Sequence, residues 1–416
     1  MKQIAACALL LTSLTVPAGY AAAPTAAPEA VGLSSARLDR ITAMIERRIA
    51  AGDIAGAVTI VGRRGRVAHH VARGVMDLDS KQPMTPRTMF RIASMTKPVV
   101  TVAVMMLIEE GKLHLNDPVA RYIPEFGKLE VAVARPAAGR GAGAGNAPDF
   151  YRVPAARAVT IKDLLTHVSG LGSGAMGNSD IAKVARKDGE TLAQYIPRLG
   201  GTALEFQPGS RWTYSPGAGF ETLGRIVEIA SATPLDQFVR RHIFDPLAAA
   251  DITFWPTDAQ RPRVATVYTR GPQGLAKAQT PNDTMSRNVY FRGSGGLYST
   301  AEDYAAFGLM LANGGALGAT RVISRKSVEM LSAVHVPDSL PGRPAGEGYG
   351  LGVRVVTDHA ARGTLLSNGT YGWSGAQGTH FFVDPKEQLV GILMVQTSNG
   401  EMQREFEDLV AQAIAD

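Results

Sequence analysis

The sequence has little cysteine, few aromatic residues and no long apolar run beyond its first residues. Its single cysteine, Cys7, lies in a segment that has the pattern of an export signal, so the exported chain has no thiol and no disulfide. Aromatic residues make up 6% of the chain, and its basic residues are scattered among acidic ones despite a net charge of +6. These features exclude a nucleic-acid-binding surface. Without a later run of eighteen apolar residues, no stable membrane insertion is expected.

Several catalytic signatures are also missing. No serine lies in a G-x-S-x-G motif, which excludes the nucleophile elbow of the α/β-hydrolases. The eight histidines show no H-E-x-x-H or similar spacing, and the chain has no P-loop, so neither a metal nor an organic cofactor is expected. Residues 172–177 match G-x-G-x-x-G. No strand is predicted before them and no βαβ unit around them, so a dinucleotide site is excluded.

The N-terminal segment predicts export. Lys2 supplies a positive charge, residues 4–16 are apolar, and residues 19–23 are mostly small and suit cleavage by a signal peptidase. We assign a signal peptide to residues 1–23. A periplasmic or secreted protein of bacterial type is therefore expected.

The rest of the chain predicts two lobes. A capped helix at residues 34–51 and a hairpin at 55–72 come first, and short strands return late in the chain before a last helix at 401–415. The intervening residues are mainly helical, so an α/β lobe built from both ends is expected around a helical insertion. The predicted boundaries are 30–93 and 293–416 for the α/β lobe, 94–292 for the helical lobe, and 135–154 for a mobile loop rich in glycine and alanine.

A serine and a lysine three positions apart, Ser94 and Lys97, precede the apolar run 99–108. If this run is a buried helix, the lysine lies one turn after the serine on the same face. Burial lowers the pKa of a lysine and makes a neutral amine available to take the serine proton. Alone, however, S-x-x-K is a common tetrapeptide whose lysine often extends from a core helix to solvent.

Two further features have simple structural explanations when each is considered alone. Tyr214 lies at a tight turn before a predicted buried helix, which also suits a structural tyrosine. Trp373 begins the run Trp373-Ser374-Gly375-Ala376, at the start of a predicted strand, and also suits a core position. The histidines His167 and His380 are expected to be structural, with a substrate contact from His380 left open.

Together and in this order, the three motifs resemble the serine β-lactamase and penicillin-binding-protein superfamily. The resemblance is closest to its class C-like branch, which includes the family VIII carboxylesterases, and it covers nearly all of the chain after the signal. It implies the α/β (α+β) fold of the β-lactamases and DD-peptidases, in which helices flank an antiparallel sheet. An all-helical lobe completes that fold, and the active site lies in the cleft between the two lobes.

The resemblance also implies a role for each motif residue. Ser94 is the implied nucleophile, Lys97 and Tyr214 are the acid–base groups, and the backbone N–H groups of Ser94 and Ala376 form the oxyanion hole. Whether the lysine or the tyrosine takes the serine proton is left open. As a close pair they are expected to titrate as a unit, by lowering each other's pKa or by stabilising a phenolate.

Two departures from the β-lactamase pattern concern the substrate. Pro216 stands where β-lactamases have the asparagine of Y-x-N, and Trp373-Ser374-Gly375 stands where they have K-T-G, whose lysine recognises a carboxylate. An indole cannot neutralise an anion. The similar W-G-G of family VIII esterases implies a small uncharged ester, bound at Trp373, Ser374 and Gly375. Arg404 or the nearby Asn399 is an alternative contact for a carboxylate.

The sequence therefore predicts a carboxylesterase that cleaves short- to medium-chain acyl esters through an acyl-enzyme on Ser94. The alternatives are a β-lactamase or D-amino-acid or DD-peptidase with weak esterase activity, and a transacylase. A non-catalytic peptidoglycan-binding or sensor protein is an alternative of another class. Retention of the serine, lysine and tyrosine together argues against it.

Overall fold

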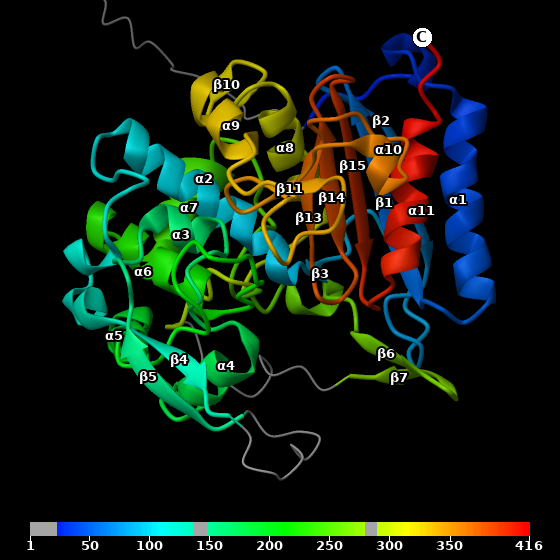
Figure 1. The fold of residues 1–416 in the computed structure, drawn as a ribbon. Coiled ribbons are helices and arrows are strands. Elements are labelled where there is room, and N and C mark those ends of the chain that lie inside the picture. The colour runs from blue at the N-terminus through cyan, green and yellow to red at the C-terminus, as the bar shows by residue number, and fades with distance from the viewer. Residues whose placement is uncertain (1–22, 137–147, 279–288) are drawn as a thin grey trace, which may run out of the picture.

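The computed structural model describes residues 23–136, 148–278 and 289–416 (Figure 1). The expected signal peptide lies outside the described residues except for Ala23, and Cys7 lies outside them too. The middle of the expected loop at 135–154 is likewise outside them.

A seven-stranded antiparallel sheet joins the two ends of the chain (Figure 1). Its strand order is β11-β12-β13-β14-β15-β1-β2. The strands are β1 (Gly56–Arg63), β2 (Arg66–Gly74), β11 (Glu347–Tyr349), β12 (Arg354–Val356), β13 (Tyr371–Ser374), β14 (His380–Asp384) and β15 (Leu389–Val395). The N-terminal β1 pairs with the C-terminal β15, with Ala57 opposite Val395. The predicted antiparallel sheet built from both ends is therefore confirmed.

Helices cover both faces of this sheet. On one face lie α1 (Ser35–Ala50) and α11 (Gly400–Ala411), and on the other lies α8 (Ala301–Ala312) (Figure 1). Successive residues of β1 enter different cores: Val58 and Ile60 pack in the cluster that contains α8, whereas Ala57 and Val61 pack under α1 and α11. Because both faces are covered, the strand is buried throughout and mainly apolar instead of alternating.

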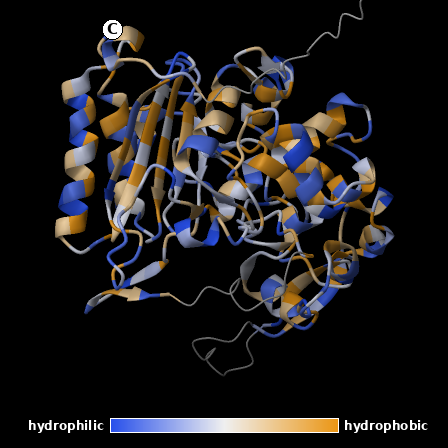
Figure 2. Cartoon of the chain, turned by 180° about the vertical axis from the view of Figure 1, so that it is seen from behind, coloured by the Kyte–Doolittle hydropathy of each residue, from blue (hydrophilic) through white to orange (hydrophobic). Residues whose placement is uncertain are grey.

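The helical part surrounds α2 (Thr96–Glu109), which is buried from Thr96 to Met105. Burial on all sides explains why the sequence of this helix shows almost no polar face. Figure 2 shows the hydrophobic residues gathered in the sheet and the inner helices. The other helices of this part are α3 (Ile161–Leu165), α4 (Gly174–Ala182), α5 (Leu192–Leu199), α6 (Ala218–Ser231) and α7 (Leu235–Val239).

Smaller elements complete the fold. Thr160 caps α3 in a capping box with Asp163. The remaining helices are α9 (Arg325–Ser332) and α10 (His359–Arg362). The remaining strands form four pairs: β3 (Phe90–Arg91) with β8 (Tyr298–Ser299), β4 (Glu130–Ala134) with β5 (Phe150–Pro154), β6 (Tyr268–Gly271) with β7 (Gly274–Lys277), and β9 (Ala316–Leu317) with β10 (Thr320–Arg321).

Two predicted boundaries differ from the structure, whereas the absence of a strand before the glycine run agrees with the prediction. Residues 150–154, assigned to a loop, form β5, because they pair with β4 over its whole length. The predicted last helix, 401–415, ends at Ala411. The glycine run at 172–177 follows the helix α3 and not a strand, and the N–H of Gly177 donates to the carboxylate of Glu205 at 2.7 Å. A side chain of the protein itself therefore occupies this part of the run.

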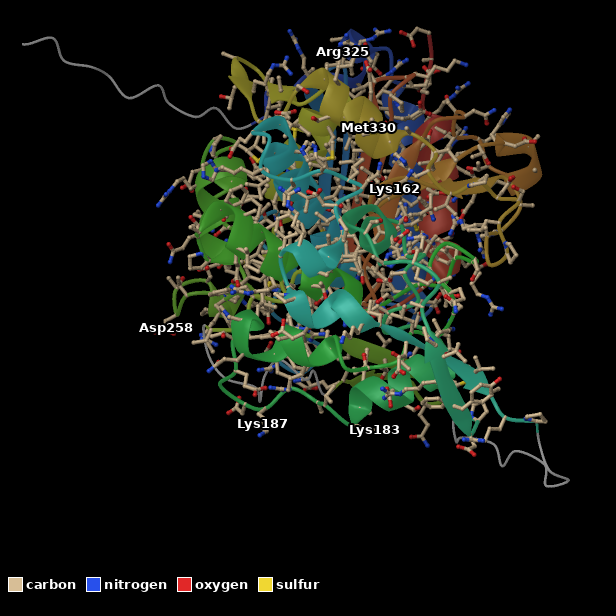
Figure 3. The ribbon with its side chains drawn as sticks, turned by 60° about the vertical axis from the view of Figure 1, so that its left-hand side comes forward. Lys162, Lys183, Lys187, Asp258, Arg325 and Met330 are labelled. Atoms are coloured by element: carbon tan, nitrogen blue, oxygen red, sulfur yellow. The ribbon has the colours of Figure 1, made fainter. Side chains whose placement is uncertain are left out.

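Charged side chains are dispersed over the surface. Lys183, Asp258 and Arg325 lie on separate segments and point away from the body of the protein (Figure 3). Their side chains are 68%, 104% and 66% exposed. Within the three described ranges, no helix has both the length and the apolar character needed to cross a membrane.

Candidate active site

Ser94 lies in a 3₁₀ turn, Ala93–Met95, directly before α2. The sequence predicts a helix from Ser94 onward, but the α-helix starts two residues later. Ala93 has a φ of 43°, a left-handed conformation that is uncommon for a residue with a side chain. Such a conformation costs about 1–3 kcal/mol and is held by the surrounding structure. The strained turn presents Ser94 at the N-terminal end of a buried helix.

Lys97 is completely buried and its amine has three oxygen partners. Nζ donates to Ser94 Oγ at 3.2 Å, to the carbonyl of Pro216 at 3.0 Å and to the carbonyl of Ser294 at 2.7 Å. Nζ also lies 4.9 Å from the centre of the Tyr214 ring. The amine is therefore held at the nucleophile by two backbone carbonyls.

Burial lowers the pKa of Lys97 to about 7. The carboxylate of Glu221 opposes this effect and the guanidinium of Arg292 adds to it. Glu221 is itself buried and accepts hydrogen bonds from Tyr290 and, at 2.8 Å, from Ser294 Oγ. The sequence prediction did not include Glu221. Its signal would have been a carboxylate among the apolar residues at the start of helix α6.

Tyr214 completes the group around the nucleophile. Its Oη lies 2.6 Å from Ser94 Oγ. Burial raises the pKa of Tyr214, although its hydrogen bond with Ser94 opposes the effect. The shifts thus favour a neutral phenol in the resting site, and the alternative of a stabilised phenolate is not supported. The pKa of Lys97 is lowered by burial and not by Tyr214, so a mutual lowering of the two pKa values is not supported either.

His167 packs against Tyr214 and contacts the backbone of the next residue. The N–H of Ser215 donates to His167 Nδ1 at 3.2 Å, and the imidazole packs against the Tyr214 ring with centroids 4.8 Å apart. Burial holds the pKa of His167 well below its ordinary value, so the ring is neutral. Its position agrees with the expected structural role.

The W-S-G motif lies beside these groups, at the end of β13 and not at the start of a strand as predicted. Trp373 packs on Tyr214 with ring centroids 5.6 Å apart. Ala376 lies in the turn after β13, because hydrogen bonds from Gly375 N–H to Thr379 O and from Gly378 N–H to Gly375 O close a tight connection to β14. Neither of these bonds uses the N–H of Ala376, the expected second oxyanion donor.

Gly375 allows this turn to contact the nucleophile's segment, and we expect Gly375→Ala to disturb both stability and activity. An added methyl group would lie 2.1 Å from Thr379 Oγ1 and 2.5 Å from the carbonyl oxygen of Ile92. Unfolding stability should fall by about 1–3 kcal/mol and activity by about 10- to 100-fold as the turn moves from the site. Thermal unfolding and ester hydrolysis measure the two effects. Gly400→Ala is the control, because nothing lies within 4 Å of its added methyl. A fully active Gly375→Ala protein would contradict this packing.

The other residues considered for substrate binding have different positions. The carbonyl of Pro216 binds Lys97, so its backbone takes part although it lacks an amide side chain. Asn399 caps α11 by accepting from Met402 N–H at 3.0 Å. Arg404 is an exposed residue of α11. In the described part of the chain, neither Asn399 nor Arg404 forms a hydrogen bond or ion pair with Ser94.

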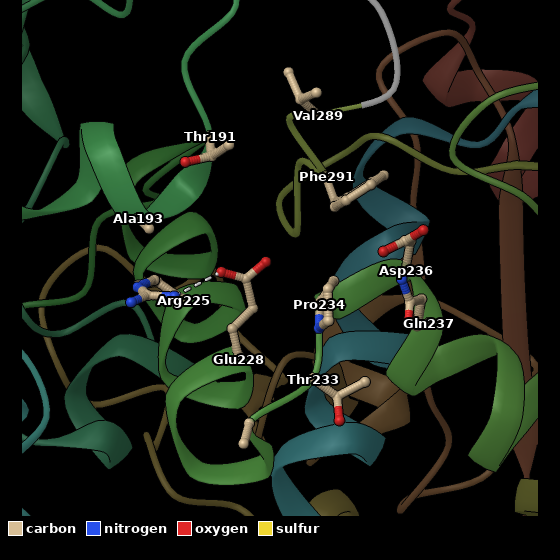
Figure 4. A pocket seen from close by; sticks show the side chains of 11 residues that line it. Thr191, Ala193, Arg225, Glu228, Thr233, Pro234, Asp236, Gln237, Val289 and Phe291 are labelled. Atoms are coloured by element: carbon tan, nitrogen blue, oxygen red, sulfur yellow. Dashed lines mark hydrogen bonds and ion pairs between the residues drawn. The ribbon is translucent and has the colours of Figure 1, made fainter.

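Two cavities lie in the helical part. One, of about 480 Å³, is bordered by Pro216, Glu221 and Arg292, close to the groups that hold Lys97. The other, of about 550 Å³, lies among α5, α6 and α7, and Arg225 and Glu228 form an ion pair in it (Figure 4). Among the described residues, no group of three or more histidine, cysteine, aspartate or glutamate side chains is arranged to hold a metal ion.

The chain is similar in sequence and fold to known proteins. The chain is 36% identical over 373 residues to protein Rv1367c of Mycobacterium tuberculosis, which covers 86% of this chain and 90% of that protein. It is 31% identical over 397 residues to the esterase EstB of Burkholderia gladioli, covering 89% and 93% of the two chains. The solved structure of EstCE1, "a hydrolase with promiscuous acyltransferase activity", superimposes with a TM-score of 0.77 at 25% identity, covering 92% and 99%.

The family model described as Beta-lactamase matches residues 41–416. This range contains the serine, the lysine, the tyrosine and the W-S-G motif, and it spans both parts of the fold. The chain therefore belongs to the β-lactamase family and is a serine hydrolase of that family.

Proposed function

We propose that the protein is an exported carboxylesterase that cleaves short- to medium-chain acyl esters through an acyl-enzyme on Ser94. One observation carries the proposal: Ser94 Oγ lies within hydrogen-bond reach of both the buried amine of Lys97 and the phenol of Tyr214. A serine hydroxyl needs such a base to become a nucleophile. The expected signal peptide supports a periplasmic or secreted location.

The two groups take separate roles in the proposed reaction. Neutral Lys97 takes the proton of Ser94 as Oγ attacks the ester carbonyl, and the N–H groups of Ser94 and Ala376 stabilise the oxyanion. The alcohol leaves with the proton of Tyr214, which regains one from the lysine. A water molecule then attacks the acyl-enzyme with the same proton transfers in reverse, and the acid is released. The neutral amine follows from the lowered pKa of Lys97, and the protonated phenol follows from the raised pKa of Tyr214.

The aromatic surroundings support an uncharged ester as substrate. Trp373 packs against Tyr214 and Tyr349, so its indole presents apolar surface beside the nucleophile. Acyl and alcohol groups without charge suit such a wall. The 31% identity with esterase EstB supports the same substrate class.

Hydrolysis of p-nitrophenyl acetate, butyrate and octanoate, with nitrocefin in parallel, tests the proposal. We expect ready cleavage of at least one ester and slow turnover of nitrocefin. Rapid nitrocefin turnover with poor ester cleavage would favour the β-lactamase or peptidase alternative. Failure of a fluorophosphonate to label the folded protein would favour a non-catalytic binding role.

Transacylation is a second candidate, because the similar EstCE1 is described as a hydrolase with promiscuous acyltransferase activity. An alcohol that enters the site in place of water would take the acyl group from Ser94. Cleavage of p-nitrophenyl butyrate in the presence of 1-butanol distinguishes a transacylase from a hydrolase. Butyl butyrate as the main product would make the protein a transacylase, and butyric acid would make it a hydrolase.

The proposed role of Lys97 predicts the pH dependence of the reaction. Since only the neutral amine accepts a proton, kcat/KM should rise about tenfold per pH unit below pH 7 and level off above it. Because the pKa of Tyr214 is raised, no loss from ionisation of the phenol is expected up to about pH 9. A midpoint near pH 10 would mean that Lys97 is charged at neutral pH and would rule out this base.

Glu221→Gln provides an internal check on that profile. Its carboxylate raises the pKa of Lys97, so its removal should move the midpoint to lower pH. Glu228→Gln is the matched control, because Glu228 lies on the same helix and pairs with Arg225 instead. An unchanged midpoint in Glu221→Gln would show that another group controls the profile.

A further inference from the structure

A second serine of the site begins a series of close polar contacts that enters the core. Ser374 Oγ lies 2.9 Å from His380 Nδ1, and His380 Nε2 lies 2.9 Å from Glu407 Oε1. Ser374 and His380 are opposite each other on β13 and β14, and Glu407 reaches them from α11. The histidine and the glutamate are 0% and 1% exposed, whereas the serine is only half-buried.

The charges around Glu407 determine where the protons lie. Burial alone would raise the pKa of Glu407, but Arg354, His380 and Arg362 hold it far below its ordinary value. Both arginines contact this carboxylate, Arg362 at 2.9 Å. Burial lowers the pKa of His380, although Glu407 opposes the effect. The pair therefore consists of a carboxylate and a neutral imidazole at pH 7.

A neutral imidazole carries one proton, and the carboxylate beside Nε2 requires that proton on Nε2. Nδ1 is then a bare acceptor, and among the described residues its partner is the hydroxyl of Ser374. The hydroxyl of Ser374 is thus directed inward to His380. Its oxygen can only accept hydrogen bonds from a group on the open side.

The open side of Ser374 borders the nucleophile. β13 pairs with β12 only through Tyr371 and Gly372, so the strand edge at Ser374 is not covered by β12. On one side of Ser374, Trp373 packs on Tyr214, and on the other side the backbone of Gly375 lies against the carbonyl of Ile92. A substrate acylating Ser94 lies beside this edge.

We propose that Ser374 is a specificity-determining residue that accepts a hydrogen bond from the substrate, with His380 and Glu407 as its positioning residues. It favours esters that carry an O–H or N–H donor near the scissile carbonyl over esters that carry a carboxylate there. A carboxylate is an acceptor only, so its lone pairs would face those of Ser374 Oγ with no hydrogen between them, and neither oxygen would gain a hydrogen bond. The inference rests on the proposed esterase function and names its substrate class.

The test compares kcat/KM for p-nitrophenyl 3-hydroxybutyrate with that for p-nitrophenyl hemisuccinate, and uses the ratio within each protein. We expect a ratio of about ten or more in the native protein. His380→Phe removes the acceptor and should bring the ratio close to one, as should Ser374→Ala. His380→Asn is the matched control, because its amide oxygen can take the place of Nδ1 and should keep the preference. A native ratio near one, or a native ratio retained in both His380→Phe and Ser374→Ala, overturns the inference.

A measurement that does not depend on turnover separates this inference from the proposed function. In ¹⁵N-histidine-labelled protein at pH 7, the His380 signals should be those of a neutral ring protonated on Nε2, assigned by their loss in His380→Phe. An imidazolium or a ring protonated on Nδ1 overturns the inference even if esters are cleaved. If the ring is protonated on Nε2 but no ester is cleaved, the proposed function is overturned, and the substrate preference with it. The position of the His380 proton would still be established.

Discussion

Ser94→Ala is expected to reduce ester hydrolysis by about 10⁴-fold or more. The variant loses the hydroxyl that lies within hydrogen-bond distance of both Lys97 Nζ and Tyr214 Oη. Without it no acyl-enzyme forms, so the N–H donors and the base have no attacking oxygen to assist. Steady-state cleavage of p-nitrophenyl butyrate measures the loss of rate. Intact mass after exposure to a fluorophosphonate measures the loss of the reactive serine.

The fold of the Ser94→Ala protein should be unchanged. Alanine suits the start of a helix, and the hydroxyl that is removed belongs to a half-buried side chain. The thermal unfolding temperature should therefore stay close to that of the native protein. Ser35→Ala, an exposed position at the start of α1, is the matched control and should keep full activity and labelling. Near-native turnover by Ser94→Ala would mean that a different residue is the nucleophile.

The parts of the site that lie close in sequence could be predicted from the sequence. Ser94 and Lys97 are three positions apart, and the apolar run after them favoured a buried helix, so a desolvated lysine could be predicted beside the alternative of one that reaches solvent. The order of the motifs added Tyr214 and Trp373 through their resemblance to a known family. The structure brings Ser94, Lys97, Tyr214 and Trp373 together as predicted.

The parts that depend on distant contacts could not be predicted. The charge of Glu221 raises the pKa of Lys97. Ser294 contacts both groups: its carbonyl accepts a hydrogen bond from the amine, and its hydroxyl donates one to the carboxylate. Neither contact follows from any local spacing. The end of β13 was misplaced because one glycine in the sequence does not by itself show that a strand ends. The strand ends where hydrogen bonds from Gly375 and Gly378 close the tight connection to β14.

The chain that links Ser374 to the core shows the same limit. Its histidine was expected to be structural, with a substrate contact left open. Its contact with Glu407 was not predicted, because that glutamate lies on α11, which follows β14 only after β15. Pairing of β13 with β14 places Ser374 opposite His380, and packing of α11 on the sheet adds Glu407. Only the register of the sheet and the rotation of the helix together establish this arrangement.

Lys97→Met is expected to lower ester hydrolysis by about 10³-fold or more, because it removes the proposed base while an unbranched side chain still fills the core. Ser94 would keep its hydrogen bond with Tyr214, but that phenol has a raised pKa and cannot take the proton at pH 7. Cleavage of p-nitrophenyl butyrate measures the effect. Lys326→Met, whose side chain is 76% exposed, is the control and should keep native activity.

The same variant should also change how stability depends on pH. In the native protein the pKa of Lys97 falls from its unfolded value of 10.5 to about 7, so between these values the unfolded state binds one more proton than the folded state. Stability due to this group therefore rises with pH, by about 1.4 kcal/mol per unit. Between about pH 7.5 and 9.5, native protein should gain about 2–3 kcal/mol in unfolding free energy relative to Lys97→Met.

Urea unfolding of the two proteins across this pH range measures that difference, since all other titrating groups contribute equally and cancel. Lys326→Met should show no such divergence, because its lysine is exposed in the folded protein. A constant difference between native protein and Lys97→Met would mean that the buried amine keeps its proton. Lys97 could then not be the base that activates Ser94 at neutral pH, and the proton would have to pass to another group.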